Sequence, residues 1–241
     1  MKIFEEFYKK FWRIYNPYDE SGHKRMETLS ALIEEYIQLP PGSLILDVGC
    51  GGAISTIALI KNQYNTVGID IRLDAVKLGW KYIREKYLPA SIICADSREI
   101  PIKNEIFDGA TLLFNPFPHW SLEDFWNISS EILRTLKSGG ICVMEFADFI
   151  QLKYQNQWKD ILLDHTGDRT LFSISGMYNS AEGTIPRTFI DPESGENWTV
   201  DFHLWSQWLI DFVLNKVGFE EIEFIRQSTD FPRKICIARK K

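Results

Sequence analysis

The sequence predicts an α/β fold in which a mostly parallel sheet is covered by helices on both faces. Short apolar runs alternate with segments whose apolar residues recur at helical spacing, and this alternation is typical of parallel strands joined by helices. Only Asp47 interrupts the apolar run 44–48, as expected for a strand buried on both faces. With 241 residues and 45% apolar composition, the chain can fill one large core, so we expect a single domain with additions.

Composition restricts the partners and the location that we expect. The net charge is −6 and no long basic run occurs, so a nucleic-acid partner is not indicated. The first residues are too acidic for a signal peptide, and no apolar run is long enough to span a membrane. The four cysteines lie far apart, which favours buried free thiols. Together these features predict a cytoplasmic protein that does not bind a membrane.

A glycine-rich turn follows the strand at 44–48. It reads Asp47-Val48-Gly49-Cys50-Gly51-Gly52-Ala53, and apolar residues at helical spacing follow from Ile54. A strand, a glycine loop and a helix in this order present free backbone N–H groups to a ligand. The dinucleotide fingerprint requires glycine or alanine where Ile54 stands, and the Walker pattern is absent, so NAD and nucleoside triphosphates are disfavoured.

This segment resembles motif I of the class I S-adenosylmethionine-dependent methyltransferases, in which an acidic residue precedes G-x-G-x-G. Ala53 replaces the third glycine. The resemblance implies a Rossmann-like three-layer sandwich with a seven-stranded sheet whose last strand is antiparallel. It also implies S-adenosylmethionine as cofactor and S-adenosylhomocysteine as product. In the family, the backbone of Gly49, Cys50 and Gly51 would pack against the cofactor, while Asp47 would order the loop or reach the amino group through water.

Two further acidic residues follow the next two predicted strands. Asp70 lies about twenty residues beyond the glycine loop, the spacing at which a carboxylate can accept both hydroxyls of a ribose, and Ile71 follows it. Asp70 could instead cap the helix that begins near Leu73. In the resembling family, an acid after the third strand accepts from the adenine amino group, and the next backbone N–H meets a ring nitrogen. The resemblance assigns these roles to Asp96 and Ser97.

The predicted fourth strand, residues 109–114, ends in an unusual loop, Asn115-Pro116-Phe117-Pro118-His119-Trp120. In the family fold this tip lies beside the methyl group. The resemblance therefore makes Asn115 and Phe117 candidate cofactor contacts, Trp120 a candidate substrate contact, and Asn115 and His119 candidate catalytic groups. Amino-directed enzymes carry [D/N/S]-P-P-[Y/F/W] here, which this loop matches only in part, so the acceptor atom stays open. His119 could act as a general base or simply bond to a backbone carbonyl.

The other segments are predicted to surround this core within one domain. Residues 1–40 are expected to form a helical cap, broken near Tyr18, a candidate substrate contact. Residues 41–147 would bind the cofactor, and residues 204–241 would complete the core. Relatives carry a substrate lid at the position of residues 148–203. Here 184–190 and 198–202 are predicted to pair as a hairpin, with Arg187 and His203 as candidate substrate contacts. No metal site is predicted.

The sequence thus predicts a methyltransferase that uses S-adenosylmethionine and a small-molecule acceptor. The sulfonium donor is already activated, so aligning the reactants and excluding water can lower the barrier by about 7–11 kcal/mol without a strong base. Two alternatives stay open. One is a non-catalytic regulator or subunit that binds the cofactor. The other is an NAD-dependent oxidoreductase on a similar fold, against which Ile54 argues. The oligomeric state does not follow from the sequence.

Overall fold

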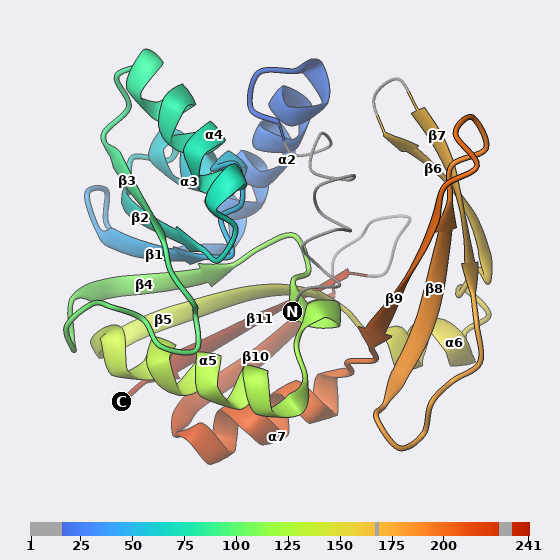
Figure 1. Ribbon diagram of the computed structural model, residues 1–241. Helices are drawn as coiled ribbons and strands as arrows, with labels where there is room; N and C mark the ends of the chain where they lie inside the picture. Colours follow the sequence, from blue (N-terminus) through green and yellow to red (C-terminus); the bar gives the residue numbers. More distant parts are fainter. Residues whose placement is uncertain (1–15, 167–168, 227–232) are drawn as a thin grey trace.

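The computed structural model describes residues 16–166, 169–226 and 233–241. It consists of a seven-stranded α/β core and a four-stranded antiparallel sheet that stands beside it (Figure 1). The first fifteen residues of the predicted helical cap lie outside the described residues.

The core sheet has the strand order β10-β11-β5-β4-β1-β2-β3. Strands β1 to β5 run parallel, and β11 is antiparallel to both of its neighbours. This confirms the predicted α/β fold, the mostly parallel seven-stranded sheet and the reversed last strand. Its strands are β1 (Leu44–Val48), β2 (Asn65–Asp70), β3 (Ala90–Cys94), β4 (Phe107–Leu112), β5 (Leu136–Ala147), β10 (Phe219–Arg226) and β11 (Arg233–Lys240).

Helices cover both faces of this sheet, which makes three layers (Figure 1). One face carries α2 (Glu20–Tyr36), α3 (Ile54–Lys61) and α4 (Leu73–Glu85). The other carries α5 (Leu122–Thr135) and α7 (Gln207–Val217). Buried apolar side chains form a separate cluster on each face, because the parallel strands present apolar residues to both sides.

The second sheet is inserted in the chain between β5 and α7. Its strands are β6 (Ile161–Thr166), β7 (Arg169–Ser175), β8 (Thr184–Ile190) and β9 (Asn197–His203), in that spatial order and all antiparallel. The pairing of β8 with β9 confirms the predicted hairpin. Leu171, Phe189 and Val200 form a small apolar cluster of their own within this sheet.

One aspartate joins the entry and the exit of the inserted segment. Asp148 caps the short helix α6 (Phe149–Tyr154) by accepting from Gln151 N at 2.9 Å. Its Oδ2 accepts from Gln207 N at 3.2 Å and from Lys234 Nζ at 3.1 Å. The two ends of the insertion are therefore fixed side by side against β11.

Candidate active site

The glycine loop is shaped by backbone conformations that glycine adopts easily. Gly49 and Gly51 have φ values of 76° and 51°. Gly49 N and Cys50 N both donate to the carbonyl of Ile69 at 2.8 and 3.0 Å, which fixes the loop to the end of β2. A Cβ added at Gly49 or Gly51 would meet nothing within 4 Å, so these positions border open space that a ligand can fill.

A cavity of about 380 Å³ opens at the carboxyl ends of β1 to β4. Ligands bind at this edge of open α/β sheets, and the volume suits a small molecule. Residues from the glycine loop, from the ends of β2, β3 and β4, from α5 and from β9 line it. They include Gly49, Cys50, Gly51, Gly52, Asp70, Ile71, Arg72, Asp96, Ser97, Arg98, Phe114, Pro116, His119, Trp120, Asp124, Ile128 and His203.

Asp70 lines the cavity and also holds the loop. Its Oδ2 accepts from Gly51 N and its Oδ1 accepts from Arg72 N, both at 2.8 Å. Burial raises the pKa of Asp70, and these two N–H donors act in the opposite direction. A carboxylate has about four acceptor positions, so two remain for a ligand's hydroxyl groups. The predicted ribose role and a role in ordering the loop are therefore compatible.

Asp47 lies behind the loop and not on the cavity. It is 1% exposed, and its carboxylate accepts from the hydroxyls of Ser55 at 2.6 Å, Thr56 at 2.7 Å and Thr111 at 3.1 Å. Burial raises the pKa of Asp47, and the three hydroxyl donors act against that shift. Of the two roles that the resemblance allowed, this geometry fits the ordering of the loop.

The end of β4 bends sharply into the cavity wall. Phe114 and Asn115 both have left-handed backbones, with φ of 67° and 55°, and strain of this kind clusters at functional sites. Two contacts hold the bend. Phe114 N donates to Glu145 Oε2 at 2.8 Å, and Asn115 Oδ1 accepts from Ala147 N at 3.1 Å. As a result, Phe114 and Pro116 line the cavity, whereas Asn115 ties the bend to the end of β5.

Two imidazoles and an indole close this end of the cavity. His119 comes from the short 3-10 turn Phe117–His119, and His203 comes from the end of β9. The His119 ring packs against Phe202 with ring centroids 5.7 Å apart. Burial, with a smaller contribution from His203, lowers the pKa of His119 to about 3. The imidazole of His119 is therefore neutral at physiological pH. Trp120 completes the wall.

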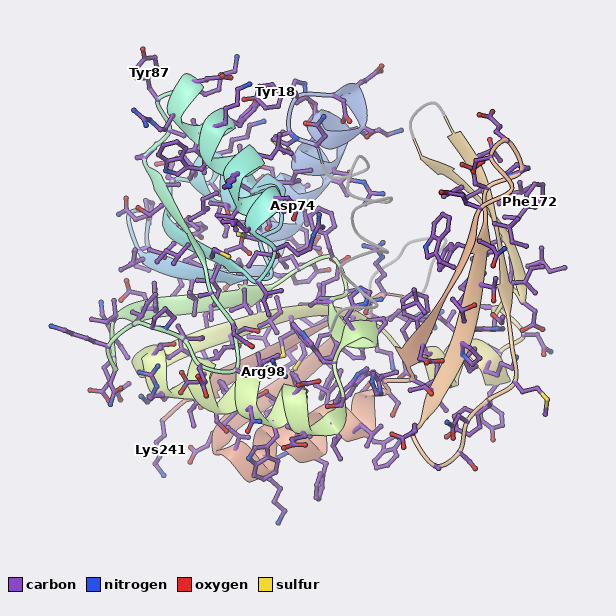
Figure 2. The ribbon with its side chains drawn as sticks, in the orientation of Figure 1. Tyr18, Asp74, Tyr87, Arg98, Phe172 and Lys241 are labelled. Carbon is purple, nitrogen blue, oxygen red and sulfur yellow. The ribbon has the colours of Figure 1, made fainter. Side chains whose placement is uncertain are left out.

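Besides Asp47, four candidate contacts lie away from the cavity, and their side chains have structural roles instead. Asn115 is described above. Phe117 is fully buried among aromatic rings, and the centroid of its ring lies 5.0 Å from that of Phe125. The Tyr18 hydroxyl donates to Glu85 Oε2 at 2.6 Å, on the outer end of α4 (Figure 2). Arg187 is buried and donates through Nε to Ser173 Oγ at 2.9 Å, within the second sheet.

The sequence reasoning missed Arg98 and Asp124, which line the cavity beside Asp96. In Figure 2, Arg98 lies over α5. It pairs with Asp96 at 2.6 Å and with Asp124 at 2.8 Å. Arg98 is two residues from Asp96, so a search for local ion pairs would have found that contact. The pairing of Asp124 with Arg98 joins residues 26 positions apart and depends on the fold.

The described residues show neither a metal site nor a membrane-spanning helix. They contain no group of three or more side chains placed to hold a metal ion. In the same residues, no helix is long and apolar enough to cross a membrane.

Comparison with known proteins shows which sequences this chain resembles. Residues 45–140 match the family model of a methyltransferase domain. An uncharacterized protein of Methanocaldococcus jannaschii is 23% identical over 218 residues, which cover 90% of this chain and 76% of that protein. A demethylmenaquinone methyltransferase of Lysinibacillus sphaericus is 30% identical over 112 residues. That match covers 45% of this chain and 46% of the relative, so the chain spans about half the length of that protein.

Solved structures share the whole fold. The PH0226 protein of Pyrococcus horikoshii superposes with a TM-score of 0.77 at 19% identity, over 98% of this chain and 99% of that one. An S-adenosylmethionine-dependent methyltransferase of Clostridium acetobutylicum gives a TM-score of 0.73 at 16% identity, over 97% and 98%. Residues 45–140, which contain the glycine loop and most of the cavity lining, therefore resemble a methyltransferase domain, and the solved structures share the fold of the chain.

Proposed function

We propose that the protein transfers a methyl group from S-adenosylmethionine to a small-molecule acceptor by direct displacement. The observation that carries the proposal is one continuous cavity. Its walls combine the glycine loop, Asp70 and Asp96 with an aromatic end built from Phe114 and Trp120. The first group suits an adenosyl ligand, and the second can enclose an acceptor and exclude water.

The residues present fit the cofactor. Asp70 retains acceptor positions for ribose hydroxyls, and the open space at Gly49 and Gly51 lets backbone approach a ligand closely. Asp96 and Ser97 line the cavity beyond β3, where we place the adenine. When bound, S-adenosylmethionine supplies an activated methyl group and a neutral thioether leaving group. The protein's task is then to orient the acceptor and keep the site dry.

The two histidines define what the acceptor end can do. A neutral His119 adds no positive charge beside a sulfonium, and with a pKa of about 3 it is a weak proton acceptor. We therefore assign it to orienting the acceptor. Burial also lowers the pKa of His203, but the carboxylates of Asp124, Glu182 and Asp201 act against that shift. His203 is the better candidate to take a proton from a hydroxyl or amine acceptor.

The wall also favours a class of acceptor. Phe114 and Trp120 present aromatic surface to the cavity, and neutral imidazoles offer no ion pair to a charged group. A small, uncharged acceptor with a flat apolar ring fits this surface. Relatives named as demethylmenaquinone methyltransferases are consistent with such an acceptor.

Calorimetric titration with S-adenosylhomocysteine, with NADH as the control ligand, tests the cofactor assignment. We expect micromolar binding of the first ligand only. Asp70→Asn should weaken that binding by about 1.5–3 kcal/mol, the scale of a hydrogen bond to a charged group. An unchanged affinity in Asp70→Asn would remove the ribose assignment. A preference for NADH would overturn the proposed function, and binding without methylation of any ring-bearing acceptor would favour the non-catalytic alternative.

A further inference from the structure

We propose that Arg98 is a positioning residue that sets the selectivity of the site for adenine, by fixing the Asp96 carboxylate as an oriented acceptor. The inference rests on the proposed function, because it needs the adenine to lie against Asp96. Arg98 belongs to none of the motifs that the sequence predicts to form the site.

The guanidinium of Arg98 forms a two-point ion pair with the carboxylate of Asp96. Arg98 Nε lies 3.0 Å from Asp96 Oδ1, and Nη2 lies 2.6 Å from Oδ2. The backbone N–H of Arg98 donates to Oδ1 as well, at 2.9 Å. Nε also lies 3.2 Å from Oδ2, as the longer arm of a shared contact. Oδ1 therefore accepts from the backbone and from Nε on its two sides, whereas both guanidinium contacts reach Oδ2 from the same side, which leaves its other side for a further donor. The two parallel contacts fix the plane of the carboxylate.

A second carboxylate fixes the other end of the guanidinium. Arg98 Nη1 donates to Asp124 Oδ1 at 2.8 Å. Asp124 is itself held by the capping box of α5, where its Oδ2 accepts from Ser121 Oγ at 2.8 Å and from Ser121 N at 3.1 Å. The rigid start of α5 therefore sets the position of Arg98, and Arg98 sets that of Asp96.

The charge of this group determines which base it accepts. Hydrogen bonding to Arg98 lowers the pKa of Asp96, so its carboxylate is ionised and can only accept hydrogen bonds. An adenine amino group donates and matches it. The carbonyl of hypoxanthine at the same position accepts, and it would face a carboxylate with no hydrogen to offer. Nε, Nη1 and Nη2 of Arg98 each donate to one of the two carboxylates, Asp96 or Asp124.

Binding of S-adenosylhomocysteine and S-inosylhomocysteine to three variants tests this role. Arg98→Met keeps the length of the side chain and removes the charge. Arg98→Lys keeps the charge and loses the planar fork. Arg84→Met, on the exposed face of α4, is the matched control. Calorimetry gives the two dissociation constants, and circular dichroism confirms that each variant is folded.

We expect the unaltered protein to bind the adenine ligand at least about tenfold more tightly than the hypoxanthine ligand, the scale of one hydrogen bond to a charged group. Arg98→Met should weaken adenine binding about tenfold and change hypoxanthine binding less than threefold, so the ratio falls. Arg98→Lys should give a ratio of the two dissociation constants between those of the unaltered protein and Arg98→Met. If Arg98→Met does not fold, the comparison of Arg98→Lys with the unaltered protein tests the proposal. Equal losses for both ligands, or no loss, would overturn the proposal. Failure of the unaltered protein to bind either ligand would instead contradict the proposed function.

Discussion

At the scale of single residues, His119 shows how the fold changes the chemistry of a side chain. Its imidazole sits at the closed end of the cavity, beside His203 and against Phe202. Burial holds its pKa near 3, whereas an exposed histidine titrates near 6.5. The folded protein therefore binds a proton at this position less readily than the unfolded chain. Stability must depend on pH through this residue.

The sign of the dependence follows from proton binding. As the pH falls below about 6.5, His119 binds a proton in the unfolded chain but stays neutral in the folded protein. Acid therefore favours unfolding. Between pH 7 and pH 4.5 we expect the unaltered protein to lose about 2.5 kcal/mol more unfolding free energy than His119→Gln. Urea denaturation at both pH values measures the difference. His23→Gln, at an exposed site on α2, is the control, and parallel pH profiles for the unaltered protein and His119→Gln would contradict the expectation.

Residue by residue, the sequence predicted the cavity lining at the ends of β1 to β3 better than the start of the loop after β4. Gly51, Asp70 and Asp96 line the cavity as expected, because each stands just past the end of a parallel strand and all such ends meet at one edge. Asn115 and Phe117 do not, because two consecutive left-handed residues at 114 and 115 turn the loop. The Asn115 side chain then accepts from Ala147 N, and the Phe117 ring lies in the core. No pattern in the sequence marks that turn.

At the scale of secondary structure elements, α4 packs against the glycine loop through a glycine of its own. A Cβ at Gly79 would lie 2.8 Å from Ala53 Cβ, 2.9 Å from Gly52 C and 3.0 Å from Gly52 O. Two of these three atoms belong to backbone, which cannot simply move aside. The helix can therefore approach the loop only because position 79 has no side chain.

Gly79→Ala should destabilise the protein, although alanine is the better helix former. Helix propensity alone predicts a gain of up to about 1 kcal/mol, while overpacking costs about 1–3 kcal/mol, so the net effect is a loss. The displaced loop should also bind S-adenosylhomocysteine about tenfold more weakly. Urea denaturation and calorimetry measure the two effects, with Lys77→Ala on the exposed face of the same helix as control. A more stable Gly79→Ala with unchanged affinity would show that the loop tolerates the methyl group.

The core elements were predictable because their period and order are local properties. Parallel strands such as β1 appear as apolar runs, and the right-handed connections between them leave few possible topologies. The first two strands of the second sheet were not predicted. In β7 the apolar residues Leu171 and Phe172 are adjacent, so the sequence does not show which of them faces the core. The pairing that buries Leu171 and exposes Phe172 becomes clear only when β8 is beside it.

At the scale of the whole molecule, both ends of the inserted segment are joined to the core around Asp148, and β9 also packs on the turn that carries His119. Phe149 N donates to Trp205 O at 3.0 Å, so the chain leaves the core and returns to it at one place. Lys234 Nζ also reaches Gln207 Oε1 at 2.9 Å, which adds β11 to the junction. The junction therefore fixes both ends of the segment that carries His203 to the core.

Asp148→Ala should loosen the second sheet while sparing cofactor binding. We expect the free energy of unfolding to fall by about 1.5–3 kcal/mol, because charge-assisted hydrogen bonds to Lys234 and to backbone are lost. Limited proteolysis should then cut first within residues 149–206. The affinity for S-adenosylhomocysteine should change less than about threefold, since Asp148 lies outside the cavity. Glu193→Ala, in an exposed turn, is the control, and first cuts within the core strands would contradict the expectation.

The junction at Asp148 also bears on how such a protein can diversify. A segment that departs and returns at a single place can be lengthened, shortened or exchanged without altering the strand order of the core. Inherited changes in residues 149–206 would then alter the side of the cavity that carries His203, while the glycine loop, Asp70 and Asp96 keep their places. The inserted segment could therefore change which acceptors fit, while the core that we propose binds the methyl donor stays the same.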